Sequence, residues 1–234
     1  MFLLCTGRKL AFRRCSEYNQ CVVLVKRDLS MSEIQMALDA LNRKGFNAVY
    51  AANAEQAKNI VLSLIGENES VGVGGSVTLD QIGLLDALAD SGRAVYSTKL
   101  AARRGGDKEE MRRLGMTADV YLSSTNALTL EGDLINIDGT GNRVAGMIYG
   151  PKKVIIVAGR NKLTKNPHTA IARIKKQACP PNARRLGLST PCATQGVCAD
   201  CDSQQRMCNV VVRIQWPPHG KEYHVVLVDG DFGY

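Results

Sequence analysis

Residues 133–143, DLINIDGTGNR, combine a short apolar strand, a turn with two glycines and the start of a helix. Branched apolar residues fill the strand, as is typical of a buried position in a sheet. Gly139 and Gly141 permit a tight turn and a close approach of the main chain to a ligand, and Asn142 belongs to a residue type that caps helices. The stretch therefore predicts a strand, turn and helix whose turn contacts a ligand.

A cation follows this turn at Arg143, in the first turn of the expected helix. A positive charge at that place opposes the helix macrodipole, so Arg143 is either solvated or joins exposed N–H groups in holding an anion. We favour the anion because it explains the cation and the turn together, and the solvated cation is the alternative.

The rest of the chain repeats the alternation of strand and helix. A helix with apolar residues at helical spacing ends at Gly45, Asn53 caps the next helix, and Asn166 with Pro167 begins a third. Repeated alternation predicts an α/β fold with a largely parallel sheet and helices on both faces. The expected strands of this core are residues 22–25, 46–51, 71–73, 119–123, 133–138 and 153–158.

Two further apolar runs near the end, residues 210–214 and 223–228, are expected to pair as a C-terminal β-hairpin across Pro217, Pro218 and Gly220. They would close an edge of the sheet or cover a small cysteine-rich lobe. The predicted organisation is a divergent basic N-terminus at residues 1–20, an α/β core at 21–178, a cysteine-rich segment at 179–209 and C-terminal strands at 210–234 that complete the core.

Glycine or hydrogen-bonding residues follow four of the expected strands. The glycine-rich turn after residues 71–73 matches neither the GxGxxG fingerprint nor a Walker A loop. In a parallel sheet the carboxyl ends of the strands share one edge, where ligands of open α/β sheets bind, so we expect one pocket for a small anionic carboxylate or phosphate. The predicted ligand-binding residues are Gly74, Gly75, Ser76, Thr125, Asn126, Asp138, Gly139, Thr140, Gly141, Asn142, Arg143, Arg160 and Lys162.

Composition narrows the class of ligand. The formal net charge is +8, but the basic residues are spread along the chain and only 5% of residues are aromatic. This balance favours small anionic molecules over nucleic acid. No apolar run approaches the length of a membrane span, so we expect a cytoplasmic protein that does not bind membranes. The sequence leaves a homo-oligomer open.

Several segments together carry a resemblance to a known family. GVGGSVTL, SSTNALT, DLINIDGTGNRVA and YGPKKVIIVAGRNK, within residues 46–163, resemble the LUD (lactate-utilisation) domain family. The closing DFGY and the cysteine segment resemble a stand-alone branch of it, whereas residues 1–20 do not match the family's usual opening helix. The resemblance implies a fold similar to the NagB/RpiA/CoA-transferase group, whose relatives bind sugar phosphates, CoA esters or folates at the same strand edge. It also implies an association with iron–sulfur, flavin-linked oxidation of lactate to pyruvate, and hence an iron–sulfur or flavin protein as partner.

Two carboxylates are candidates for catalysis. Relatives of the CoA-transferase type use a glutamate as acyl acceptor, and Glu131 is placed to act in this way, although Glu-Gly also makes an ordinary hairpin turn. Asp138 is suited to orient a ligand hydroxyl or to pair with Arg143, and the alternative is an Asx turn that stops the strand.

Five of the eight cysteines lie between Cys179 and Cys208. Four of them have the spacing C-x5-C-x2-C-x6-C, which suits a tetrahedral metal or a [4Fe–4S] cluster, although it matches neither common ferredoxin run. The redox resemblance favours iron–sulfur slightly over zinc, and reduced cysteines in a loop are the alternative. The predicted metal ligands are Cys192, Cys198, Cys201 and Cys208.

Three functions follow from these observations. The first is an accessory protein of lactate utilisation that binds a small anion or carries electrons. The second is a self-sufficient enzyme acting on a CoA-linked or phosphorylated metabolite. A non-catalytic anion sensor is the third.

Overall fold

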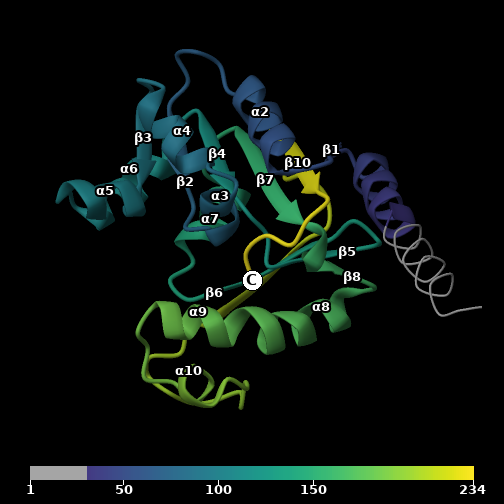
Figure 1. Cartoon of the computed structure of the whole chain (residues 1–234), viewed down its shortest axis with the longest axis vertical. Coiled ribbons are helices and arrows are strands. Elements are labelled where there is room, and N and C mark those ends of the chain that lie inside the picture. Colours follow the sequence, from purple (N-terminus) through teal and green to yellow (C-terminus); the bar gives the residue numbers. More distant parts are fainter. Residues whose placement is uncertain (1–30) are drawn as a thin grey trace, which may run out of the picture.

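The computed structural model describes residues 31–234 (Figure 1). The predicted basic segment 1–20 and the strand 22–25 lie outside this part of the chain. An unlabelled helix covers residues 31–43. The helices that follow are α2 (Ala54–Leu64), α3 (Val77–Gln81), α4 (Leu84–Asp90), α5 (Thr98–Arg104), α6 (Lys108–Met116), α7 (Asn142–Ile148), α8 (Pro167–Arg173), α9 (Cys179–Arg185) and α10 (Pro191–Gln195). The strands are β1 (Asn47–Ala51), β2 (Val71–Val73), β3 (Val95–Ser97), β4 (Val120–Ser123), β5 (Ala127–Thr129), β6 (Leu134–Asp138), β7 (Lys153–Gly159), β8 (Leu163–Thr164), β9 (Val210–Ile214) and β10 (Glu222–Val228).

Six parallel strands form the main sheet, in the order β1-β10-β7-β4-β2-β3. The predicted α/β fold with a largely parallel sheet is confirmed. β7 and β10 lie in its interior, and both are nearly continuous apolar runs because side chains on both of their faces are buried.

Helices cover both faces of this sheet, as predicted. Side chains of β7 that point to one face pack with α2, α3 and α4. Those that point to the other face pack with the helix at 31–43, with α7 and with a second sheet. The alternation follows from the period of two along a strand, which sends Ile155 and Val157 to one side and Val154 and Ile156 to the other.

The second sheet has four strands, in the order β8-β5-β6-β9. The opening stretch forms β6 of this sheet, antiparallel to β5 and β9, so the expectation that it belongs to the parallel sheet was wrong. The prediction that the last two strands pair as a C-terminal β-hairpin was also wrong. β9 pairs with β6, whereas β10 lies between β1 and β7 of the main sheet. β10 is apolar on both faces and therefore suits a sheet interior, whereas β9 alternates in exposure and suits an edge.

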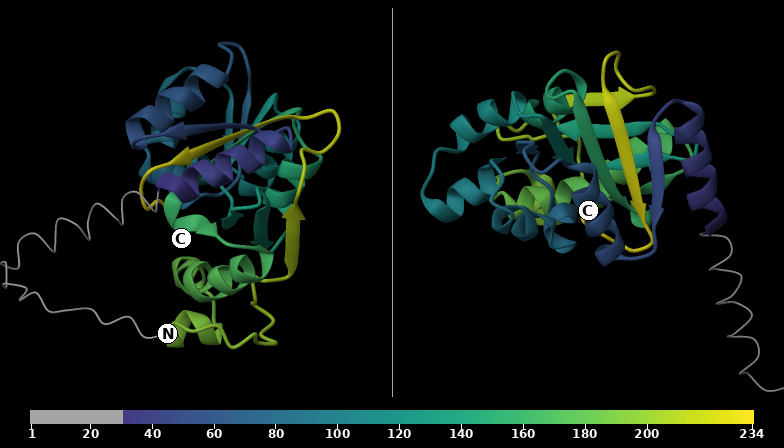
Figure 2. Two further views of the ribbon diagram at one scale, coloured as in Figure 1. Left: turned by 90° about the vertical axis from the view of Figure 1, so that its right-hand side faces the viewer. Right: turned by 90° about the horizontal axis from the view of Figure 1, so that it is seen from above.

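A third layer lies beneath the second sheet. α8 continues through a π-helical segment (Ile174–Ala178) into α9, and the buried side of this helix packs on β5 and β6. The cysteine-rich segment with α10 lies on the far side of α9 from the main sheet (Figures 1 and 2). None of the helices in residues 31–234 has the length and apolar character needed to cross a membrane.

A buried carboxylate joins three distant parts of the chain. Asp133, at the start of β6, is fully buried and pairs with Lys44 at 2.6 Å and with the Nη2 of Arg213 at 2.7 Å. Lys44 follows the helix at 31–43, and Arg213 lies in β9. The carboxylate therefore connects that helix to β6 and β9. A buried charge must be paired in this way, because desolvation would otherwise shift it toward its neutral form.

Replacement of Asp133 by Asn is expected to lower the free energy of unfolding by about 3 kcal/mol, because it leaves two cations without their shared anion. Urea unfolding followed by circular dichroism measures the change. Asp86→Asn is the matched control, since Asp86 forms an exposed ion pair with Arg103 and should change stability very little. Equal effects of the two substitutions would contradict a structural role for the buried carboxylate.

Candidate functional site

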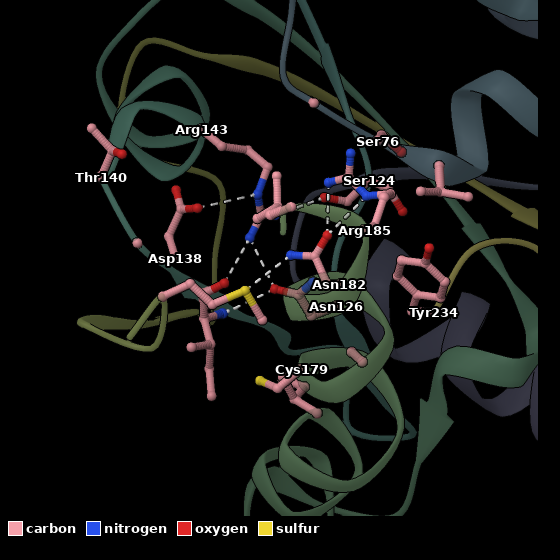
Figure 3. Close-up of a pocket in the computed structure, with 18 of the residues that line it drawn as sticks. Ser76, Ser124, Asn126, Asp138, Thr140, Arg143, Cys179, Asn182, Arg185 and Tyr234 are labelled. Carbon is pink, nitrogen blue, oxygen red and sulfur yellow. Dashed lines mark hydrogen bonds and ion pairs between the residues drawn. The ribbon is translucent and has the colours of Figure 1, made fainter. Parts of the chain in front are cut away.

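A cleft of about 510 Å³ opens between the carboxyl edge of the main sheet, the end of β6 and the helix α9 (Figure 3). The end of β2 supplies Gly75 and Ser76, and the end of β4 supplies Ser124 to this cleft. On the opposite side lie Asn182 of α9 and the segment 205–209. The size is that of a pocket for a small metabolite and exceeds what a single water-sized ion needs.

Arg143 lies on the wall of the cleft with its guanidinium engaged by the protein. Nη1 donates to the carbonyl of Ser124 at 3.0 Å and to Oδ1 of Asn136 at 2.7 Å. Nη2 donates to Oδ1 of Asn126 at 2.9 Å and to the carbonyl of Ile137 at 3.2 Å. Burial lowers the pKa of this arginine. Its charge therefore reaches the cleft, but most of its N–H donors are already used.

Lys162 is a deeply buried basic side chain on the wall of the cleft. It is 3% exposed, and its Nζ donates to Oγ1 of Thr78 and to Oγ of Ser124, each at 2.8 Å. No carboxylate in the described part of the chain pairs with it. Burial, followed by the charges of Arg173 and Arg143, lowers the pKa of Lys162 to about 7. An anion in the cleft would supply the missing charge and raise that pKa again.

The C-terminal segment covers Lys162. Oγ1 of Thr78 donates to the carbonyl of Phe232, and the main-chain N–H of Gly233 donates to Oε1 of Gln81. Gly233 has φ +67°, and a Cβ there would stand 2.3 Å from Oγ1 of Thr78 and 3.2 Å from Nζ of Lys162. Glycine suits this approach, so the C-terminal segment packs closely against Thr78 and Lys162.

The charges that line the cleft are strongly unbalanced. Among the described residues on its walls, Asp138 is the one acidic side chain. It accepts a hydrogen bond from the main-chain N–H of Val144 at 3.3 Å, and its other oxygen is 3.8 Å from Nε of Arg143. The basic side chains on the walls are Arg112, Arg143, Lys162, Arg185 and Arg206. Such an excess of positive charge in a concave site raises the local concentration of anions.

Most of the predicted binding residues come together at this cleft, although contact with a ligand stays a prediction. Those on its walls are Gly75, Ser76, Thr125, Asn126, Asp138, Gly139, Thr140, Asn142, Arg143 and Lys162. Gly74, Gly141 and Arg160 are not among the wall residues. Asp138 accepts a hydrogen bond from the main-chain N–H of Val144 in α7 and lies 3.8 Å from Nε of Arg143, so it faces that arginine, whereas its contact with a ligand hydroxyl stays a prediction.

The residues outside the walls have other contacts. Arg160 turns toward the C-terminal segment, where it pairs with Asp229 at 2.8 Å. Gly74 gives room to the Arg143 side chain, because a Cβ there would stand 3.0 Å from its Cγ. Gly141 precedes α7 in the left-handed region at φ +88°. Glu131 is exposed in the turn between β5 and β6 and is not on the cleft wall.

Sequence reasoning missed several residues of the site. Ser124 and Thr78 hold Lys162. Ser124 directly follows β4 beside the predicted Thr125, and that position was the available signal, whereas Thr78 lies in α3, two residues after the predicted Ser76. Arg185, Arg206 and the C-terminal Tyr234 come from segments far along the chain, and no local pattern links them to the strand ends.

The four predicted metal ligands gather around a second, smaller cavity. Cys192, Cys198, Cys201 and Cys208 line a space of about 20 Å³. Cys179 approaches Cys208 with a sulfur–sulfur distance of 3.5 Å, and this contact lowers the pKa of Cys208 to about 7 while it raises that of Cys179. In residues 31–234 no set of three or more Cys, His, Asp or Glu side chains is arranged to hold a metal ion as it stands.

Comparison with known proteins identifies the family. No curated protein matches the chain. A crystal structure of a DUF162 family protein from Deinococcus radiodurans is similar over 86% of this chain and 98% of its own, with 12% identity and a TM-score of 0.49. A family model described as the LUD domain matches residues 34–228. The chain therefore belongs to the LUD (lactate-utilisation) domain family, and this membership supports a role related to lactate utilisation in general terms.

Proposed function

We propose that this LUD domain protein binds a small anionic metabolite in the cleft and that Lys162 is the group that meets the anion. The observation that carries the proposal is a buried lysine whose two hydrogen-bond partners are neutral hydroxyls. A third N–H of the ammonium group stays available, and Lys162 lies on the cleft wall. Because an unpaired buried charge is costly, an anion at this place gains both a charge-assisted hydrogen bond and relief of that cost.

The chemistry of the walls favours a carboxylate or a phosphate. Hydroxyl and amide groups of Ser76, Ser124 and Asn126 surround the cationic end of the cleft, and they can hydrogen-bond oxygen atoms of either anion. Lactate and pyruvate are much smaller than a space of about 510 Å³, so either would fill only its deep end. In this proposal the protein serves lactate utilisation as an accessory that holds such an anion, together with an iron–sulfur or flavin protein as partner.

The second candidate is an enzyme for a CoA-linked or phosphorylated metabolite. The observation that favours it is the presence of three further cations, Arg112, Arg185 and Arg206, on the walls of the same cleft. A ligand with more than one anionic group would meet Lys162 and one or more of these arginines. Turnover of acetyl-CoA that disappears in Asp138→Asn would favour this candidate, and binding without turnover would favour the accessory role or a sensor.

Replacement of Lys162 by Met is expected to weaken anion binding by about tenfold to a hundredfold, the worth of one hydrogen bond to a charged group. Isothermal titration calorimetry with L-lactate, pyruvate, inorganic phosphate and acetyl-CoA measures the change. The variant should fold at least as well as the wild type, since it removes a buried charge that has no counter-ion.

Arg160→Met is the matched control for this substitution. Arg160 is also a cation directly after β7, but it pairs with Asp229 away from the cleft, so its loss should change affinity by less than about twofold. Unchanged affinity in Lys162→Met would refute the proposal. Equal losses in both variants would show a general effect of net charge.

The affinity for a carboxylate ligand is expected to fall as pH rises above about 7. The pKa of Lys162 is about 7 in the free protein, so above that pH the lysine must take up a proton when the anion binds. Affinity then falls by up to about tenfold per pH unit. Calorimetry in buffers of different ionisation enthalpy measures the proton uptake directly. A slope that persists in Lys162→Met would assign the titration to another group.

A further inference from the structure

The cysteine-rich lobe is built around the small cavity that four thiols line. Cys192 lies in the first turn of α10. Cys198 and Cys201 lie in the loop after this helix, and Cys208 lies just before β9. Three separate segments therefore direct a thiol to one space. Its volume of about 20 Å³ is that of one water molecule or one ion.

Polar contacts support the sulfur atoms of this cavity. The main-chain N–H of Asp200 donates to Sγ of Cys198 at 3.5 Å, and Oγ1 of Thr190 lies 3.4 Å from Sγ of Cys192. Asp200 has φ +48°, and no other non-glycine residue among those described has a positive φ. This left-handed turn lies between Cys198 and Cys201, which line the same cavity. Hydrogen bonds to sulfur are the outer contacts that metal thiolates receive.

A cation, Arg206, completes the surroundings of the cavity. Nη1 of Arg206 donates to the carbonyl of Cys201 at 2.8 Å, and its Nη2 donates to the carbonyl of Cys208 at 3.2 Å. Arg206 thus joins Cys201 to Cys208 and places a positive charge beside the thiols. Four thiolates around a divalent ion carry an excess of negative charge, which a neighbouring guanidinium offsets.

We propose that Cys192, Cys198, Cys201 and Cys208 form a tetrahedral site for one zinc ion, and that this ion fixes one wall of the anion cleft. The thiol side chains need to turn toward the centre of the cavity to reach the zinc–sulfur distance of about 2.3 Å. Cys179 is outside the cavity and contacts Cys208 from the side of the cleft. It is not a ligand in this arrangement.

The link to the cleft lies in the segment that carries Cys208. Arg206 and Met207 line both the cysteine cavity and the anion cleft. The main-chain N–H of Asn209 donates to the carbonyl of Asp138 at 3.0 Å, and its side-chain amide donates to the carbonyl of Gly139 at 3.3 Å. A zinc ion bound by Cys208 and Cys201 would hold this segment against the turn of the opening stretch. This second half of the proposal rests on the proposed function, whereas the metal site does not.

The metal site is tested by elemental analysis of anaerobically purified full-length protein. We expect one zinc per chain in the wild type, less than about a tenth of that in Cys201→Ser, and one zinc per chain in the matched control Cys179→Ser. Iron with acid-labile sulfide, no metal at all, or loss of zinc in Cys179→Ser would each overturn the assignment. Chelation of the wild type gives a metal-free form without a substitution, and zinc titration should restore one ion per chain.

The link to the cleft is tested by calorimetry with the anion of the panel that binds best to zinc-loaded wild type. Removal of zinc should weaken that binding by at least about fivefold, and zinc addition should restore it, because loss of an outer support of a site commonly costs tenfold or more. Equal affinity of the two forms would overturn the link and leave the metal site intact. Zinc binding without any anion binding would instead refute the proposed function alone.

Discussion

Four hydrogen bonds from the guanidinium of Arg143 join the two sheets at the place where the cleft forms. Two of their acceptors follow β4 of the main sheet, at Ser124 and Asn126, and two belong to β6 of the second sheet, at Asn136 and Ile137. Each hydrogen bond to a charged group is worth about 1.5–3 kcal/mol when its partner would otherwise stay buried and unpaired. The guanidinium therefore helps to fix the relative position of the sheets, together with the apolar core that is packed between them.

The same arrangement explains the state of Lys162. Arg143 and Arg173 are buried near it, and their positive charges add to desolvation in lowering its pKa. The guanidinium of Arg143 is held by neutral acceptors and therefore keeps its charge without a close carboxylate, since Asp138 stands 3.8 Å away. The cleft thus contains fixed positive charge before any ligand arrives. Binding of the proposed anion would then require little rearrangement of the protein, which favours affinity.

The cysteine-rich lobe belongs to the same structure as the cleft. Arg206 contacts the carbonyls of two cysteines and also lies on the cleft wall, and Asn209 is bonded to the turn after β6. A change in the lobe would therefore reach the cleft through main-chain contacts that are already present. These contacts connect the two features of the sequence, the strand-end turn and the cysteine segment.

The sequence by itself determined the local structure. Apolar periodicity and capping residues predicted β2 and β9 to the residue, and the caps at Asn53 and Asn166 form as expected. These signals act within a few neighbouring residues and are therefore visible in a single chain. Most of the strand-end residues expected to face a ligand do line the cleft, because the carboxyl ends of parallel strands share an edge. The segment with β3 and α5, by contrast, carries too short an apolar pattern to be recognised.

Only the tertiary structure decided which segments pair and which charges are satisfied. β10 enters the main sheet while β9 joins β6, since strand pairing depends on what covers each face and not on distance along the chain. Three cations follow strands in the sequence, and nothing local distinguishes their partners. In the structure Arg143 is held by main-chain and amide oxygens, Arg160 pairs with Asp229, and Lys162 has hydroxyl partners alone. The difference arises because each partner comes from another part of the fold, and the cost of a buried charge depends on that partner.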